Sequence, residues 1–363
     1  MKEIRVFQGL SEVAGQLYYS VRGLREAGIK TTHLVWMPSV FGYEYDISLN
    51  IDKSKKKFLP ILPIWAAKLF YYECKILKEH NVFHFHYGRS LLLNYDLGLF
   101  RKFHKRVFFE FHGSDLRDYE YARTLNPYMP VEGMTAGIEK LKKSVAKICR
   151  YADGIILHDD ELIPHLPEKR PGVYVVPLRM DLQKIVPVYV SKESKKVRIV
   201  HAPTRRNAKG SDYLIAAVEQ LKKRYDIELV IVENKTQKEA LELYGTADII
   251  VDQLRAGTYG VFAIESMAMG KPVITYITDE MRERLPADLP IYSASPDTIT
   301  QKLEDLIANG QLRYELGIQG RKYVEKYHDY RKNAQMLYDI YRGKIKPIQG
   351  REAFAYAAAK KLL

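Results

Sequence analysis

The sequence lacks the features that mark secreted or membrane-spanning proteins. Its 363 residues include only two cysteines, Cys74 and Cys149, which are too few for a disulfide framework, so we expect a reducing, cytoplasmic setting. No stretch reaches the ~20 uninterrupted apolar residues that a membrane-spanning helix needs. The opening residues, MKEIRVFQGL, are typical of a strand and a loop, which argues against a cleaved signal peptide.

The composition is that of an ordinary globular protein with a surplus of positive charge. The chain is longer than one core usually supports, so two domains are expected. The net charge of +13 favours anionic partners: a phosphate-bearing ligand, an acidic membrane surface or nucleic acid. A well-solvated basic surface explains the charge equally well. Because the chain has no recognition-helix pattern, nucleic acid is not expected as a partner.

Short apolar runs alternate with helical patterns in two successive sets. The first set contains IRVF, THLVW, VFHFH, RVFFEF and GIILH, and the second contains VRIVHAP, ELVIVE, ADIIVD and PVITY. Helical stripes cover residues 14–27 and 211–224. Continuously apolar strands separated by helices are typical of parallel sheets covered on both faces. The sequence therefore predicts an α/β fold of two doubly wound units, joined by a lysine-rich linker near residues 187–196.

A basic loop follows the first strand of the second set. In HAPTRRNAKGSDYL the cations Arg205, Arg206 and Lys209 precede Gly210, and Ser211 is a fair N-cap for the next helix. Ligands of open α/β sheets bind at the carboxyl ends of strands, where cations beside a helix N-terminus suit a diphosphate. A solvated basic loop is the alternative interpretation.

The segment GTYGVFAIESMAMGKPVITY, residues 257–276, holds a lone acid among apolar residues. It predicts a helix that begins near Val261, with the N–H groups of Gly260, Val261 and Phe262 facing an anion. Glu265 lies one turn further in, and its side chain leans back toward the helix start. There it can hold the paired hydroxyls of a ribose. A first-turn glutamate that only complements the helix dipole is the alternative.

Together these segments resemble the retaining GT-B glycosyltransferases, especially glycosyltransferase family 4. The segment at 257–276 is similar to the family's donor-site signature, and the loop ending in KG is similar to its diphosphate-binding loop. SEVAGQLYYSVRGLREAG resembles its first loop and helix, FEFHGSDLR the segment with its active-site histidine, and VVPLRMDL the run that ends its first domain. The resemblance covers nearly the whole chain in the expected order.

The resemblance implies two Rossmann-like domains that face each other across a cleft. The first, residues 1–187, would bind the acceptor, with a C-terminal stretch at 331–363 crossing back to it; the second, residues 195–330, would bind the donor. The implied reaction moves a sugar from a nucleotide-diphosphate donor to a glycan, lipid-linked or small-molecule acceptor with retention of configuration. No metal or other cofactor is expected, because cationic side chains would neutralise the leaving diphosphate.

The resemblance also implies roles for individual residues. Lys209 and one of the two loop arginines would hold the diphosphate, Glu265 the ribose, and His112 would contact the donor sugar near the reacting carbon. Further donor-binding residues would be Tyr259, Gly260, Val261, Phe262, Glu233 and Asn234, and the backbone of Ala14, Gly15 and Gln16 would close on donor and acceptor.

The chain departs from the family pattern in three places. Gly257 stands where the first of two glutamates contacts the transferred sugar, and Asp252 would replace that acid only if the loop folds back. The spacing of the basic loop does not indicate whether Arg205 or Arg206 binds the diphosphate. ENKT, residues 233–236, replaces a glycine-rich turn that would border the base, so the nucleotide stays unassigned.

Several histidines lie at expected strand ends. His84 and His86 alternate on one strand, and His112, Asp115 and His158 form a conceivable metal set. With no convincing ligand set, a structural or cleft-lining role is favoured for them.

Aromatic and basic segments at 36–46 and 59–75 lie in the expected acceptor domain. Trp65, Leu69, Phe70 and Tyr71 with nearby lysines suit a membrane surface and a lipid-linked acceptor, which would place the protein peripherally on the inner face. An amphipathic helix packed on its own sheet is an equal alternative. Other function classes left open are a catalytically silent nucleotide-binding protein and a nucleotide-sugar epimerase.

Overall fold

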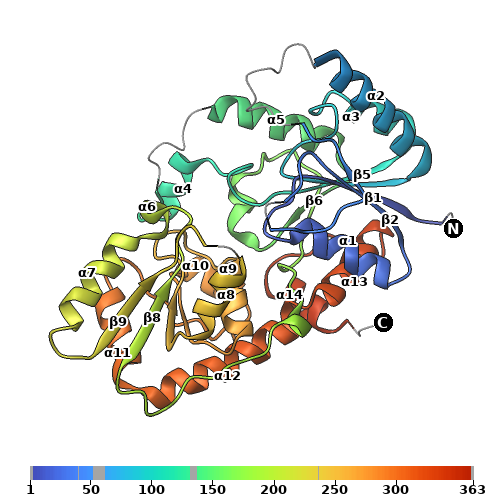
Figure 1. Cartoon of the computed structure of the whole chain (residues 1–363). Coiled ribbons are helices and arrows are strands. Elements are labelled where there is room, and N and C mark those ends of the chain that lie inside the picture. Colours follow the sequence, from blue (N-terminus) through green and yellow to red (C-terminus); the bar gives the residue numbers. More distant parts are fainter. Residues whose placement is uncertain (1–2, 40, 52–61, 131–136, 236, 361–363) are drawn as a thin grey trace. The chain divides into compact units, whose positions relative to one another are not determined.

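The computed structural model describes residues 3–39, 41–51, 62–130, 137–235 and 237–360. The chain divides into two compact units (Figure 1). Unit 1 comprises Met1–Arg117, Gly137–Arg179 and Tyr330–Leu363, and unit 2 comprises Asp118–Ala136 and Met180–Asp329. Each unit is built on its own parallel sheet, so the predicted α/β class with Rossmann-like parallel sheets is confirmed.

The units differ from the predicted boundaries at two places. Helix α4 (Tyr119–Leu125) and the residues after it belong to unit 2. There the side-chain amide of Asn126 donates to the carbonyl of Arg255 at 2.7 Å, and Arg255 Nε donates to the carbonyl of Tyr128 at 2.7 Å. The chain also leaves unit 1 after Arg179, earlier than the predicted residue 187.

The sheet of unit 1 has seven parallel strands in the order β3-β2-β1-β4-β5-β6-β7. The central strands are buried along nearly their whole length, as expected for a parallel sheet covered on both faces. The strands are β1 Arg5–Leu10, β2 Lys30–Val35, β3 Ile47–Ser48, β4 Val82–His86, β5 Arg106–Glu110, β6 Gly154–Leu157 and β7 Gly172–Val175.

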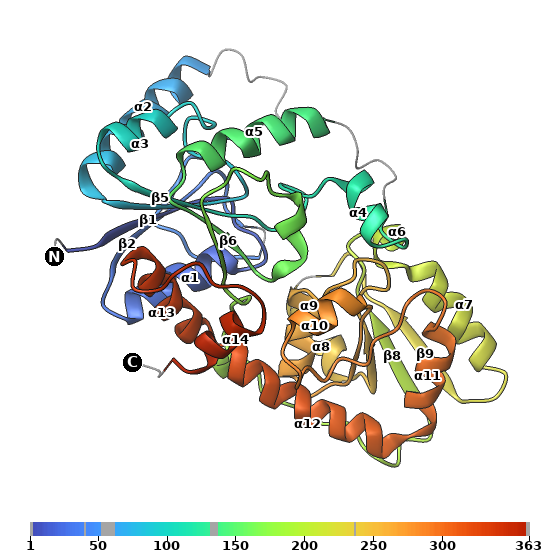
Figure 2. The same cartoon turned by 180° about the vertical axis from the view of Figure 1, so that it is seen from behind.

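Helices cover both faces of this sheet (Figures 1 and 2). Helices α1 (Gln16–Glu26) and α13 (Tyr330–Tyr341) pack against each other on one face. The other face carries α2 (Leu62–Glu79), α3 (Leu97–Lys102) and α5 (Ile138–Tyr151), and phenylalanines of β4 and β5 fill the core beneath them. A 3-10 helix, η2 (Asp160–His165), and helix α14 (Gly350–Ala358) complete the described part of the unit.

Unit 2 has a four-stranded parallel sheet in the order β11-β10-β8-β9. Its core joins these strands to α7 and α11 through Leu214, Leu221 and Leu303. The strands are β8 Val197–His201, β9 Ile227–Ile231, β10 Ile249–Val251 and β11 Val273–Ile274. The remaining elements are η3 Leu182–Lys184, α6 Arg206–Lys209, α7 Ser211–Leu221, α8 Gln237–Gly245, α9 Val261–Ala268, α10 Asp279–Arg284, α11 Ile299–Ala308 and α12 Gly310–Tyr327.

Helix α2 has two apolar faces. Trp65 and Leu69 pack against the core of unit 1, so for these two residues the packing alternative is correct and the membrane-facing interpretation is wrong. Phe70 and Tyr71 instead lie on the outside, 67% and 60% exposed. No helix in the described ranges combines the length and apolar character that a bilayer crossing requires.

Candidate functional site

The basic loop of unit 2 lies where β8 ends. His201, the last residue of β8, lies 2.7 Å from the carbonyl of Val251 through Nδ1 and 2.8 Å from Ser211 Oγ through Nε2. This fixes the end of β8 to β10 and to the start of α7. Gly210 has φ +75, a left-handed conformation that lets the short helix α6 turn directly into α7. The loop cations therefore sit on a rigid strand end.

Two of the three predicted phosphate-binding cations are paired with carboxylates. Lys209 Nζ donates to Asp252 Oδ1 at 2.6 Å and to Gln253 Oε1 at 3.1 Å, just beyond the carboxyl end of β10. Arg206 makes a bidentate pair with Glu233, with distances of 2.9 and 2.6 Å. A diphosphate that binds here would compete with these carboxylates for the two cations. The third cation, Arg205, is the N-cap residue of α6.

The start of α9 is open to a ligand. The helix begins at Val261, as predicted, and its N-cap Gly260 supplies no side-chain cap. First-turn N–H groups of a helix carry partial positive charge and have no partner within the helix. Phe262 in this turn packs against Tyr244, with ring centroids 4.7 Å apart. The helix start thus lies where it was predicted, with an aromatic pair beside it, and its binding of an anion stays a prediction.

Glu265 lies on α9 as predicted. Burial, together with the nearby charge of Asp252, raises its pKa to about 7. The side chain has no hydrogen bond to another residue within the described ranges, so its oxygens remain available to hydroxyl donors. Asn234, predicted to border the base, is exposed with φ +54, and its neighbour Glu233 is held by Arg206.

Tyr259, a predicted donor-binding residue, is packed inside unit 2. Its side chain is only 5% exposed, and its hydroxyl lies 3.0 Å from Tyr323 Oη and 3.1 Å from His328 Nε2. The ring therefore belongs to the packing of the α9 loop against α12. Its predicted role in donor binding stays a prediction.

Gly257 occupies a position that suits glycine. Its φ is +86, and a Cβ built there would lie 2.8 Å from Thr278 Cγ2. A side chain would meet both backbone strain and a steric clash. Asp252, considered as a replacement for the missing glutamate, is fully buried and held by Lys209, so it has a partner of its own.

A cluster of histidines gathers at the carboxyl ends of β4, β5 and β6 in unit 1. His86 ends β4, His112 follows β5, and His158 follows β6. His86 Nδ1 lies 3.2 Å from His112 Nε2, and His112 Nδ1 lies 3.0 Å from His158 Nε2. Parallel neighbouring strands bring these residues together, because their carboxyl ends meet at one edge of the sheet.

Glu110 and Arg179 form a buried ion pair beneath the histidines. Both side chains are fully buried, and Arg179 Nη2 donates to Glu110 Oε1. The same carboxylate oxygen lies 3.5 Å from His86 Nδ1 and 3.6 Å from His158 Nε2. Although burial alone would raise the pKa of Glu110, Arg179 and the histidines hold it well below its usual range. Glu110 is therefore a buried anion.

The first loop is tied to this ion pair. Gln16 Oε1 accepts from the N–H of Arg179 at 2.8 Å, and Gln16 Nε2 donates to the carbonyl of Arg179 at 3.1 Å. Ala14 and Gly15 before it have φ of +49 and +80, so the chain turns sharply into α1. The side chain of Gln16 thus positions Arg179, and only the backbone of the loop is left for the predicted ligand contacts.

His112 is held as a neutral imidazole. Its side chain is 3% exposed, and both ring nitrogens face other histidines. Burial, reinforced by His158, lowers the pKa of His112 well below its usual range. Its predicted contact with the donor sugar stays a prediction, and would be made by the ring edge or after rotation of His158.

Glu110 and Arg179 were not identified from the sequence. Glu110 is a single acid in the apolar run RVFFEF, and Arg179 a single cation in VVPLRMDL. The reasoning that selected Glu265, a lone carboxylate among apolar neighbours, applies equally to Glu110 and would have found it.

The cluster contains two candidate metal-ligand sets. Ligand atoms of His84, His86 and Glu110, and of Glu110, His112 and His158, lie within 4.8 Å of one another. Both sets depend on Glu110, whose carboxylate already faces the guanidinium of Arg179. A divalent ion at that carboxylate would be repelled by this buried positive charge. The geometry therefore favours a structural role for these histidines over metal binding.

No protein-family model and no curated protein matches the sequence. Solved structures do match the fold. Sucrose-phosphate synthase from Thermosynechococcus elongatus aligns with a TM-score of 0.65 at 14% identity, covering 94% of this chain and 99% of that one. Anabaena HepE in complex with UDP-glucose aligns with a TM-score of 0.60 at 11% identity, covering 93% of this chain and 99% of that one. A putative UDP-N-acetylglucosamine 2-epimerase from Listeria monocytogenes aligns with a TM-score of 0.50 at 13% identity, covering 96% of this chain and 99% of that one.

These similarities extend over nearly the full length of each chain. At 11–14% identity they show that this chain shares its α/β fold with these three proteins. Activity and substrate are matters for the site residues, because one fold supports many functions.

Proposed function

We propose that this protein is a retaining, metal-independent glycosyltransferase that uses a nucleoside-diphosphate sugar. Unit 2 would hold the donor and unit 1 the acceptor, which would be a glycan, a lipid-linked sugar or a small molecule. Two comparisons support the donor class: HepE is described in complex with UDP and with UDP-glucose, and sucrose-phosphate synthase is named for a sugar product. A hexose as the transferred sugar and cell-surface polysaccharide as the product belong to the same proposal.

The observation that carries this proposal is the open start of α9. Gly260 leaves the first-turn N–H groups without a side-chain cap, and Lys209 is anchored by Asp252 beyond the neighbouring end of β10. A diphosphate placed on these groups would meet a helix dipole and a cation together. Glu265, further along the same helix, would accept hydrogen bonds from the ribose hydroxyls.

The chemistry follows from charge. Breaking the bond between sugar and phosphate builds negative charge on the leaving diphosphate, and fixed donors that meet this charge lower the barrier. Lys209 and the N–H groups of α9 are such donors, with Arg205 or Arg206 as a further one. Attack from the same face, assisted by the leaving phosphate, retains configuration without a protein nucleophile.

A thermal-shift screen of nucleotides and nucleotide sugars tests the donor site. A ligand that stabilises the wild type but not Lys209→Ala identifies the donor, since ligand binding raises the melting temperature by mass action. Lys222→Ala, an exposed lysine on a different part of unit 2, is the matched control. Stabilisation that is the same in all three proteins would remove Lys209 from the site. The anomeric configuration of the product, read by NMR, tests retention.

Two other functions stay open. The similarity to a putative 2-epimerase supports nucleotide-sugar epimerisation. Gly257, in place of the family's acid, supports nucleotide binding without turnover. Incubation with the identified donor separates them: an epimerised sugar supports the first, and tight binding without reaction across many acceptors supports the second.

Localisation in the cytoplasm, with peripheral attachment to a membrane, is part of the proposal. Ile64, Phe70 and Tyr71 of α2 are 67%, 67% and 60% exposed, and lysines of the same helix add positive charge. Sedimentation with vesicles that contain anionic lipid tests this. Binding should fall for Phe70→Gln, and binding that is unchanged by the substitution would remove α2 as the contact.

A further inference from the structure

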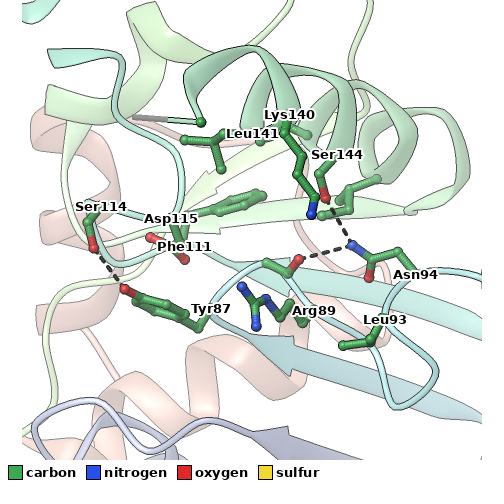
Figure 3. Close-up of a pocket in the computed structure, with 14 residues that line it drawn as sticks. Tyr87, Arg89, Leu93, Asn94, Phe111, Ser114, Asp115, Lys140, Leu141 and Ser144 are labelled. Carbon is green, nitrogen blue, oxygen red and sulfur yellow. Dashed lines mark hydrogen bonds between the residues drawn. The ribbon is translucent and has the colours of Figure 1, made fainter. Parts of the chain in front are cut away.

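A pocket of about 560 Å³ lies in unit 1 beside helix α5, and all of its lining residues belong to that unit. Loops that follow β4 and β5 form one wall, and the first turns of α5 form the other (Figure 3). Carboxyl ends of parallel strands are where ligands of α/β sheets bind. The side chains that matter below are Tyr87, Arg89, Phe111, Asp115, Lys140 and Ser144.

Two cations enter this pocket from opposite walls. Figure 3 shows Arg89 on the loop after β4 and Lys140 on α5, both directed into the pocket. Neither side chain has an ion pair or hydrogen bond with another residue in the described ranges. The carboxyl of Asp115 also lines the pocket, but its Oδ1 accepts from backbone N–H groups and it forms no ion pair with either cation in the described ranges. Two like charges that are not paired repel each other, so an anion between them would be stabilised.

Helix α5 reinforces this positive field. Lys140 lies in its first turn, where the helix dipole disfavours a cation. The N-cap Gly137 has no side chain, so the first N–H groups of this 14-residue helix are not capped by it. Glu139 in the same turn does not line the pocket. A cation placed against the local dipole, beside uncapped N–H groups, points to an anionic ligand.

The rest of the lining suits a sugar. Tyr87 Oη lies 2.8 Å from Ser114 Oγ, and Asn94 Nδ2 donates to Ser144 Oγ at 3.2 Å, so hydroxyls and an amide line the pocket. The rings of Tyr87 and Phe111 supply apolar faces against which a sugar ring can pack.

The pocket wall is also joined to His112. Asp115 is 6% exposed, and its Oδ1 accepts from the N–H groups of His112 and Gly113 at 2.9 Å each. Its Oδ2 has no hydrogen-bond partner in the described part of the chain. A bound sugar hydroxyl would satisfy an acceptor on this carboxyl and would lie next to the His112 loop.

We propose that this pocket is the acceptor site and that the acceptor is a phosphate-bearing sugar, its phosphate held by Arg89, Lys140 and the start of α5. The proposal rests on the glycosyltransferase function and names its acceptor class. The phosphate belongs either to a free sugar phosphate or to a lipid diphosphate, because both present the same anion to the two cations.

Calorimetric titration of the full chain tests this. The probes are hexose monophosphates, their unphosphorylated hexoses, and farnesyl diphosphate as a soluble lipid diphosphate. The variants are Arg89→Gln and Lys140→Gln, with Lys143→Gln as control on the same helix but outside the pocket lining. All three residues are exposed, so the variants should fold. Lys209→Ala separates pocket binding from binding of phosphate in unit 2.

We expect a phosphate-bearing probe to bind about tenfold more weakly to each pocket variant, as for the loss of one charged hydrogen bond, and unchanged to Lys143→Gln and Lys209→Ala. If a hexose phosphate gives this result, the acceptor is a free sugar phosphate. If farnesyl diphosphate gives it, the phosphate belongs to a lipid diphosphate. Equal binding of phosphorylated and plain hexoses, or equal loss in Lys143→Gln, overturns the proposal. If nucleotides bind through Lys209 but no probe binds to the pocket, the acceptor assignment is wrong and the donor site stands. If the probes bind to the pocket but no nucleotide binds through Lys209, the donor site is wrong instead.

Discussion

Glu110 in unit 1 and Glu265 in unit 2 are both single carboxylates in apolar stretches, yet they reach opposite protonation behaviour. Glu110 is fully buried, and Arg179 with the histidines holds its pKa well below the usual range. Glu265 forms no ion pair with any residue that the structure describes; burial and the charge of Asp252 raise its pKa to about 7. The comparison teaches that the counter-charge, more than burial, decides whether such an acid is a fixed structural anion or a group left available to a ligand.

The largest expected effect comes from removing the counter-charge in unit 1. Arg179→Met leaves Glu110 as an unpaired buried carboxylate, which should lower the free energy of unfolding by about 3–5 kcal/mol. Urea unfolding followed by circular dichroism measures this. The double variant Arg179→Met, Glu110→Gln removes both charges and should recover much of the loss. A double variant that is no more stable than the single one would contradict the ion-pair interpretation.

The next largest expected effect is a dependence of stability on pH that comes from Glu265. The folded pKa of Glu265, about 7, lies above the unfolded value of 4.5, so folding favours its protonated form. This stability is complete below about pH 4.5 and is lost as the pH rises through 7. Relative to Glu265→Gln, the wild type should therefore lose stability between pH 5 and pH 8 in urea unfolding. A constant difference between the two proteins would show that Glu265 ionises normally.

His158 should give unit 1 a contribution with the opposite sign. Burial lowers its pKa from 6.5 to about 4, so the folded chain binds fewer protons than the unfolded chain between these values. The stability is present above pH 6.5 and is lost as the pH falls toward 4. His158→Asn should remove this part of the acid sensitivity, measured by unfolding at pH 7 and pH 4.5. An unchanged pH profile would mean that the pKa of His158 is not lowered in the fold.

The smallest expected effect on stability concerns Arg206 in unit 2. Its pair with Glu233 is exposed, and such pairs contribute about 0–1 kcal/mol, so Arg206→Gln should unfold almost like the wild type. Nucleotide affinity should nevertheless fall about tenfold if Arg206 holds a phosphate. Arg205→Gln provides the matched comparison that ranks the two arginines. Equal affinity in both variants and the wild type would leave Lys209 as the phosphate cation.

Local signals in the sequence predicted much of the fold, including where two helices of the proposed donor site begin. Helix α7 begins at Ser211 and α9 at Val261, as predicted, because glycine and small polar residues mark these starts directly. Contacts between distant residues were missed. Glu110 and Arg179 are 69 residues apart in the sequence, and Tyr259 is 64 and 69 residues from its partners Tyr323 and His328. Such pairings depend on strand order, which the local pattern does not encode.

The left-handed turn at Gly257 limits how the proposed sugar site could be redesigned. Grafting the family's glutamate onto this position alone would push a side chain against Thr278 in a backbone conformation that L-residues avoid. A protein engineer would have to replace the whole turn between β10 and α9 to install that acid. Under the proposed function, recognition of the transferred sugar would therefore fall to groups other than a side chain at position 257.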